Sequence, residues 1–169
     1  DCLRSLDLDW FVLRPSLIYG RGGGSAELFM RLAALPMIPV IGDGQQKLQP
    51  VHISDVVATA MRALLAPESS QTLDIVGTET VPFADWLKKM REVQGRRPAP
   101  LLPVPFGIAM ACARLGRHLN PILQPDNLRM LKAGYWADPA PVEKFLGRPL
   151  LCSAPSLFFA DATTFGSAS

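Results

Sequence analysis

The alternation of two apolar patterns along the chain constrains its fold more than any other feature. Short apolar runs predict strands at residues 10–13, 38–41 and 73–77, and residues 48–53 are expected to be extended. Apolar residues recur at helical spacing in segments that begin at Ser25, Ser54 and Pro82. Strands that alternate with helices are joined by crossover connections, which favour parallel pairing. The sequence therefore predicts an α/β domain with a parallel sheet.

The helix expected from Ser54 and Asp55 carries a continuous apolar stripe. Its members are Val56, Val57, Ala60, Met61, Leu64 and Leu65. Residues at this spacing share one helix face, which is typical of an amphipathic helix. Asp55 in the first turn suits the positive end of the helix dipole. In the preceding helix, Ser25 is the expected N-cap.

The helix expected after Pro82 has the same amphipathic character. Proline is tolerated at the start of a helix because its missing N–H has no partner there. The predicted buried face is formed by Phe83, Trp86, Leu87, Met90 and Val93, and Gly95 is the expected stop. From Arg96 onward, prolines separate short helical pieces, one of them expected over residues 106–117.

The charge balance argues against a nucleic-acid partner. The 169-residue chain has 17 basic and 15 acidic side chains, and no segment is a basic run. The three cysteines, Cys2, Cys112 and Cys152, are odd in number and widely spaced. This spacing favours neither a metal site nor a disulfide scaffold, so we expect reduced intracellular thiols and no bound metal.

Nothing at the start of the chain has the pattern of a signal peptide, which favours a cytoplasmic location. The longest uncharged stretch, residues 98–113, falls short of the roughly 20 residues that span a bilayer. The helix expected over 106–117 is therefore interpreted as a core helix, and association with a membrane surface is the alternative. Because the chain lacks a starting Met, we expect a fragment of a longer protein.

The glycines at positions 20, 22, 23 and 24 invite comparison with a dinucleotide-binding turn. Such a turn has its first glycine almost immediately after a strand, so that the next helix faces a pyrophosphate. Here residues 15–19 separate the strand from the glycines, and Ser25 stands where the third glycine of the motif belongs. From the residues alone, a surface loop is favoured over a cofactor fingerprint.

Three blocks of sequence resemble the later half of extended or atypical short-chain dehydrogenases/reductases, the NAD(P)-dependent epimerase/dehydratase group. They are "DWFVLRPSLIYGRGG", "IGDGQQKLQPVHISDVV" and "LDIVG", and the similarity extends over about residues 1–150. The form "QPVHISDV" is more similar to the atypical branch that includes the nucleotide-binding accessory subunit of respiratory complex I.

The resemblance implies the C-terminal half of a Rossmann-like doubly wound parallel sheet plus a small, mainly helical substrate-binding part. We expect the sheet portion, with inserted substrate-domain strands, over residues 1–95 and a helical lid region over 96–150. Residues 151–169 form a tail for which disorder is one interpretation. In this group the pyrophosphate loop and the catalytic tyrosine–lysine pair lie upstream, so no catalytic residue is expected in this chain.

The resemblance also assigns binding roles. Pro15, Ser16 and Leu17 would contact the nicotinamide end of the cofactor through main-chain groups. Leu17, Tyr19, Leu48 and Gln49 would face the substrate. Nucleotide-sugar enzymes tend to carry an asparagine where Leu17 stands and a phosphate-binding arginine where Leu48 stands. The two leucines make a nucleotide sugar doubtful and favour an apolar small molecule, with Lys47 directed to the opposite face of its extended segment.

His52 and Asp55 allow two interpretations. An imidazole near a carboxylate can transfer protons, which would suit catalysis. The favoured interpretation is structural: Asp55 starts the helix and His52 orients the turn before it. Tyr19 is likewise expected to pack rather than to act as an acid.

The combined expectation is the C-terminal fragment of an NAD(P)-dependent oxidoreductase or epimerase-like protein, inactive alone. The cofactor would be NAD or NADP in the parent protein, with none bound by the isolated chain. A homo-oligomer is expected, because the strand at 10–13 would keep an unpaired edge. The alternatives are a non-catalytic nucleotide-binding subunit or assembly factor of a membrane complex, and a free-standing small α/β binding module.

Overall fold

A computed structural model describes residues 9–20, 24–67, 70–116 and 125–152. Its strands are β1 (Phe11–Pro15), β2 (Ile18–Tyr19), β3 (Ile38–Ile41), β4 (Lys47–Leu48), β5 (Val51–His52), β6 (Gln71–Ile75), β7 (Val81–Pro82) and β8 (Leu101–Val104). Its helices are α1 (Gly24–Ala33), α2 (Ile53–Leu65), α3 (Phe83–Val93), α4 (Phe106–Gly116), α5 (Pro125–Ala133) and α6 (Ala140–Leu146). The expected mixture of strands and helices is confirmed.

Three of the four strand pairs in the described residues are parallel. β1 and β6 run side by side, with Phe11 opposite Gln71 and Pro15 opposite Ile75. β2 pairs with β5 and β3 pairs with β8, both parallel, whereas β4 and β7 are antiparallel. Each parallel pair joins strands far apart in the sequence, which requires the crossover connections expected of an α/β fold.

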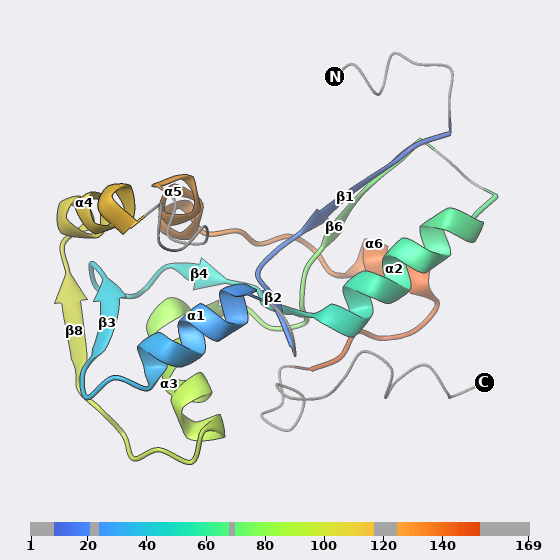
Figure 1. The fold of residues 1–169 in the computed structure, drawn as a ribbon. Helices are drawn as coiled ribbons and strands as arrows, with labels where there is room; N and C mark the ends of the chain where they lie inside the picture. Colours follow the sequence, from blue (N-terminus) through green and yellow to red (C-terminus); the bar gives the residue numbers. More distant parts are fainter. Residues whose placement is uncertain (1–8, 21–23, 68–69, 117–124, 153–169) are drawn as a thin grey trace.

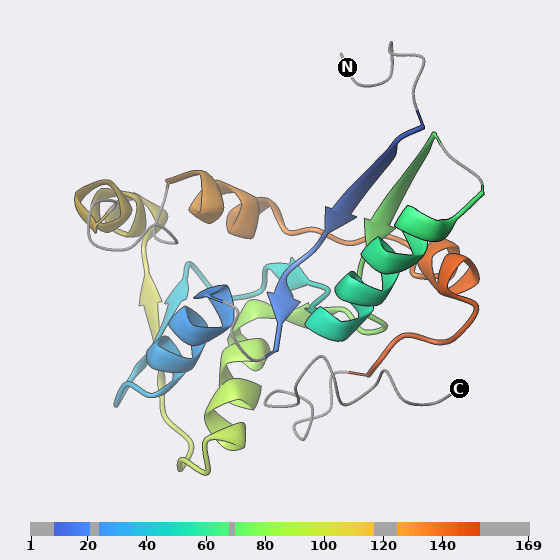
Figure 2. The same ribbon diagram turned by 45° about the vertical axis from the view of Figure 1, so that its right-hand side comes forward.

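The elements gather around two hydrophobic clusters. Figures 1 and 2 show β1, β6, α2 and α6 on one side of the molecule and α1, α3, β3 and β8 on the other. The larger cluster contains Phe83, Trp86, Leu87 and Met90, the face predicted for α3. The smaller cluster is built from Val51, Ile75, Val142 and Leu150. The segment that leads from α5 to α6 is one of the connections that cross between the two sides (Figure 2).

Strand β8 was not expected from the sequence. Its residues lie among Pro100, Pro103 and Pro105, a composition that favours breaks rather than strands. Within the described residues β8 pairs with β3 along one edge, and a proline can be accommodated where no partner needs its missing N–H. Residues 96–150 therefore contribute a strand to one side and helix α6 to the other, and their assignment as a lid region stays a prediction.

The helix starts differ slightly from expectation. α1 begins at Gly24, so Ser25 lies inside its first turn rather than at the cap. α2 begins at Ile53, with His52 as its N-cap residue. The Nδ1 atom of His52 accepts a hydrogen bond of 3.2 Å from the backbone N–H of Ser54. The imidazole thus performs the capping role that hydroxyl and carboxylate side chains usually have.

Four of the six members of the apolar stripe on α2 are exposed. Val57, Met61, Leu64 and Leu65 are exposed, Leu65 to 80%. The buried positions of α2 are instead Ser54, Asp55 and Thr59. The spacing of the apolar residues correctly predicted a helix. Within the described residues, however, no buried core packs against most of the apolar face of α2.

None of the described helices is long and apolar enough to cross a membrane. Cys112 and Cys152 are free, exposed thiols. Cys2, residues 21–23 of the glycine turn and the tail from residue 153 lie outside the described residues.

Candidate functional site

The candidate site lies where β1 and β6 end. Beyond β1, the backbone N–H of Ser16 donates a 2.9 Å hydrogen bond to the carbonyl of Ile75. The hydroxyl of Ser16 donates to the carbonyl of Gln49. Pro15 is exposed, while Ser16 and Leu17 are half-buried. The carboxyl edge of parallel strands is where ligands bind in open α/β sheets.

At this edge, the chain that follows β6 lies in close contact with residues 49–51. The backbone N–H of Gly77, just beyond β6, donates a 3.3 Å hydrogen bond to the carbonyl of Gln49. A Cβ atom at Gly77 would lie 1.9 Å from the carbonyl oxygen of Pro50, closer than any side chain tolerates. Only glycine therefore allows the end of β6 to lie against residues 49–51, next to the chain leaving β1.

Gln49, a predicted substrate residue, has both ends of its amide engaged. Its Nε2 donates a 2.7 Å hydrogen bond to the carbonyl of Gly77, and its Oε1 accepts a 2.9 Å bond from the backbone N–H of Ala137. The residue is only 4% exposed. Gln49 thus joins the end of β6 to the segment that crosses toward α6, and contact with a substrate stays a prediction.

Tyr19 and His52 lie opposite each other in the β2–β5 pair. Both are buried, with ring centroids 5.2 Å apart and edge-to-face. Tyr19 also packs edge-to-face on Trp86, with ring centroids 5.3 Å apart. Its hydroxyl donates a 3.3 Å hydrogen bond to the carbonyl of Cys152. These contacts agree with the structural interpretation of His52 and with packing by Tyr19.

The two leucines on which the substrate argument rests occupy different environments. Leu48 is 5% exposed and belongs to the larger hydrophobic cluster. Leu17 is half-buried and packs against the same cluster. Lys47, next to Leu48, is exposed. The structure therefore brings Leu17 to the strand edge and directs Leu48 into the core.

Asp55 is connected to a distant part of the chain. Its fully buried carboxylate forms a 2.7 Å ion pair with Arg148 and accepts a 2.9 Å hydrogen bond from the backbone N–H of Leu151. A buried carboxylate requires such partners because burial removes its hydration. These contacts agree with a structural role for Asp55 as an anchor of the segment after α6.

The sequence did not indicate a polar group beside this edge. The hydroxyl of Tyr135 donates a 2.7 Å hydrogen bond to Oδ1 of Asp74, and Arg14 lies 3.9 Å from the same oxygen. Burial, with the hydrogen bond and negative charge of Asp74 as smaller contributions, raises the pKa of Tyr135 from 10.0 to about 12. No spacing rule could have found this group, since Asp74 and Tyr135 are 61 residues apart.

The described residues contain no group of three or more histidine, cysteine or carboxylate side chains that could hold a metal ion. At Pro15–Leu17, Pro15 is exposed, the N–H of Ser16 donates to Ile75, and the carbonyl of Leu17 accepts a 2.9 Å hydrogen bond from the N–H of Val51. Contact of this stretch with the nicotinamide end of a dinucleotide stays a prediction.

Comparison with known proteins gives a fold. No family model matches the sequence, and no curated protein matches it. UDP-glucuronic acid 4-epimerase from Bacillus cereus, solved with UDP-glucuronic acid and NAD, is similar in structure with a TM-score of 0.63 and 16% identity. The match covers 95% of this chain and 46% of that chain.

Two further solved structures agree. The human epimerase family protein SDR39U1 (isoform 2) with NADPH gives a TM-score of 0.62 at 24% identity, covering 88% of this chain and 45% of that one. The dTDP-glucose 4,6-dehydratase DesIV from Streptomyces venezuelae, with NAD and TYD bound, gives a TM-score of 0.62 at 16% identity. That match covers 91% of this chain and 42% of the DesIV chain. The chain spans about half the length of these structures. Its Rossmann-like α/β fold, shared with epimerases and dehydratases that bind NAD or NADPH, is confirmed.

Proposed function

We propose that this chain forms the nicotinamide-end and substrate-facing part of an NAD(P)-dependent oxidoreductase or epimerase. The observation that carries the proposal is the packed edge at which β1, β6 and residues 49–51 end together beside Pro15–Leu17. The fold shared with structures solved with NAD or NADPH supports the same assignment.

In this proposal, Pro15, Ser16 and Leu17 orient the nicotinamide ring. Pro15 fixes the direction of the chain as it leaves β1. The N–H of Ser16 is held by Ile75 and its hydroxyl by Gln49, so the loop has a defined conformation before any ligand arrives. The bound nicotinamide would supply hydride transfer. The acid/base group of the reaction is proposed to lie outside this chain.

The substrate is proposed to be a small, largely apolar molecule. Leu17 lies at the strand edge, and the crossing segment reaches the same region, as the Tyr135–Asp74 hydrogen bond beside β1 shows. Trp136, next in that segment, is 70% exposed. An exposed indole beside a ligand edge can cover an apolar substrate and exclude water from it. Leu48, which is buried in the larger cluster, is proposed to support this surface from below.

The test is titration of NADH and NADPH into this chain and into the full encoded protein that contains it. We expect energy transfer from tryptophan to bound reduced nicotinamide in the full protein and negligible binding by the chain alone. Hydride transfer to small apolar ketones or aldehydes, followed by nicotinamide absorbance, tests the reaction class. Binding without turnover of any carbonyl or alcohol would favour the non-catalytic nucleotide-binding subunit. No binding by either protein would refute the proposal.

We also propose self-association of the chain. Within the described residues β6 is the one strand partner of β1, and the exposed α2 residues Val57 and Leu64 lie on the same side of the molecule. A strand edge beside exposed apolar surface favours pairing with another chain. Light scattering at increasing protein concentration should show a dimer or larger species, and a monomer at every concentration would contradict this.

A further inference from the structure

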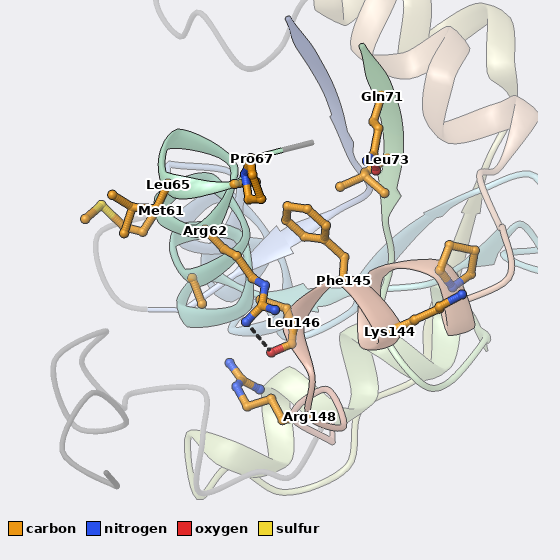
Figure 3. A pocket seen from close by; sticks show the side chains of 13 residues that line it. Met61, Arg62, Leu65, Pro67, Gln71, Leu73, Lys144, Phe145, Leu146 and Arg148 are labelled. Atoms are coloured by element: carbon orange, nitrogen blue, oxygen red, sulfur yellow. Dashed lines mark hydrogen bonds between the residues drawn. The ribbon is translucent and has the colours of Figure 1, made fainter. Parts of the chain in front are cut away.

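A groove of about 1010 Å³ lies between the C-terminal half of α2, the start of β6, and α6 (Figure 3). It is lined by Met61 and Leu65 from α2, Leu73 from β6 and Phe145 from α6. Its size reaches the upper end of the roughly 300–1,000 Å³ of small-molecule pockets. The groove can therefore hold a ligand with a long apolar part.

The apolar lining includes side chains that the sequence pattern assigns to a protein core. Met61 is 56% exposed and Leu65 is more exposed still, although both belong to the apolar stripe of α2. Exposure of large apolar side chains to water is unfavourable. Apolar residues exposed along a groove are typical of a surface that binds an apolar ligand.

The charged lining of the groove has one sign. Arg62, Lys144 and Arg148 contribute to it, and no carboxylate does among the described residues that line it. Arg62 contacts the carbonyl of Leu146 at 3.4 Å, with its guanidinium 5.8 Å from the centre of the Phe145 ring. The buried carboxylate of Asp55 neutralises Arg148. Two of the three positive charges thus have no anionic partner in the groove.

We infer that this groove binds a single-chain amphiphile with an anionic head group, of the fatty-acid type. The aliphatic chain would lie along Met61, Leu65 and Phe145, and the carboxylate would accept hydrogen bonds from Lys144 or Arg62. An ionised carboxylate paired with an ammonium or guanidinium group forms the stronger class of hydrogen bond. The apolar walls favour the aliphatic chain, and the positive charges without an anionic partner favour an anionic head group over a neutral or a cationic one.

The groove is separate from the proposed nicotinamide edge. It meets β6 at Gln71 and Leu73, toward the start of the strand, whereas Pro15 and Ile75 form the opposite end of the β1–β6 pair. Binding here would therefore be independent of the proposed function, and the two can fail separately.

Calorimetry with sodium dodecanoate below its micelle concentration tests the inference on the chain itself. Dodecyltrimethylammonium matches the chain but reverses the head-group charge, and butyrate keeps the head group without the chain. We expect dodecanoate to bind at least about tenfold more tightly than either, because both the apolar walls and the positive charges contribute. Equal affinity for the two long-chain compounds would overturn the inference.

A charge-reversal variant tests the head-group contact. Lys144→Glu is expected to weaken dodecanoate binding about fivefold, on the scale of an exposed ion pair. Lys88→Glu on α3 is the matched control, since Lys88 is also exposed but lies outside the groove, and it should leave the affinity unchanged. Equal effects of the two substitutions would contradict a specific contact.

A photoreactive diazirine fatty acid locates the bound chain. We expect adducts on peptides that contain residues 58–67 and 141–148. Adducts confined to residues 15–19 would assign the amphiphile to the proposed nicotinamide edge and overturn the groove. Binding of an acidic amphipathic peptide in the absence of any dodecanoate binding would also overturn it, in favour of a protein partner.

Discussion

The carboxylate of Asp55 lies 2.7 Å from the guanidinium of Arg148, which joins the first turn of α2 to the segment after α6. The pair is asymmetric, because the Asp55 side chain is fully buried whereas that of Arg148 is 39% exposed. Leu151 adds a backbone N–H to the same carboxylate, so one side chain holds two points of the C-terminal segment.

This asymmetry predicts that the two partners do not tolerate substitution equally. Arg148→Met should lower the free energy of unfolding by about 3 kcal/mol, because it leaves a buried carboxylate without its counter-charge. Asp55→Asn should lower it by only about 1–2 kcal/mol, since Arg148 can turn toward water. Urea unfolding followed by circular dichroism measures both. A larger loss in Asp55→Asn would contradict the proposed asymmetry.

Gln49 should contribute to stability through its two amide contacts. Gln49→Leu leaves the carbonyl of Gly77 and the N–H of Ala137 without partners and is expected to cost about 2 kcal/mol. Gln45→Leu, an exposed glutamine in the same stretch, is the control and should change stability by less than about 0.5 kcal/mol. Hydrogen exchange of the Ala137 amide should accelerate in the first variant alone.

Gly77 and Gly107 form a matched pair for glycine-to-alanine substitution. At Gly77 the added methyl group collides with the carbonyl of Pro50, so a loss of about 3 kcal/mol is expected. At Gly107, in the first turn of α4, the methyl group meets nothing within 4 Å. There alanine should stabilise the helix by about 0.5 kcal/mol. Thermal unfolding of the two variants should shift in opposite directions.

The raised pKa of Tyr135 predicts a loss of stability at high pH. Because the folded state keeps this phenol neutral up to about pH 12 while the unfolded chain ionises near pH 10.0, its contribution is complete below pH 10 and disappears as the pH rises toward 12. The stability difference between wild type and Tyr135→Phe should shrink across that window. Asp74→Asn should lower the pKa of Tyr135 only in part, because burial is the larger cause. A constant difference across the window would argue against the shift.

Leu48→Arg tests where this side chain points. Since Leu48 packs among Tyr19, Trp86 and other buried residues, a guanidinium there should destabilise the fold by about 3 kcal/mol or more. Lys47→Arg at the exposed neighbour should have no measurable effect. If Leu48→Arg were tolerated as well as Lys47→Arg, position 48 would face an open site, as its alignment with phosphate-binding arginines suggests.

Much of the local structure could be predicted because it depends on residues close together in the chain. The apolar face of α3, the strand at 38–41 and the parallel α/β class follow from periodicity and from the positions of proline and glycine. The edge at Pro15–Leu17 was found through resemblance to a family, not through spacing. Its assignment as a nicotinamide contact is still a prediction.

Tertiary structure decided which predicted faces are covered and which polar groups are buried. The stripe of α2 specified a helix, but burial of Met61 and Leu65 requires a neighbour, and α6 leaves a groove there instead. Asp55 is buried because Arg148 and Leu151 reach it from the far end of the chain. Apolar periodicity indicates the secondary structure of a segment and which of its faces is apolar. Whether that face is buried depends on which distant segment packs against it, and a local pattern contains no information about distant segments.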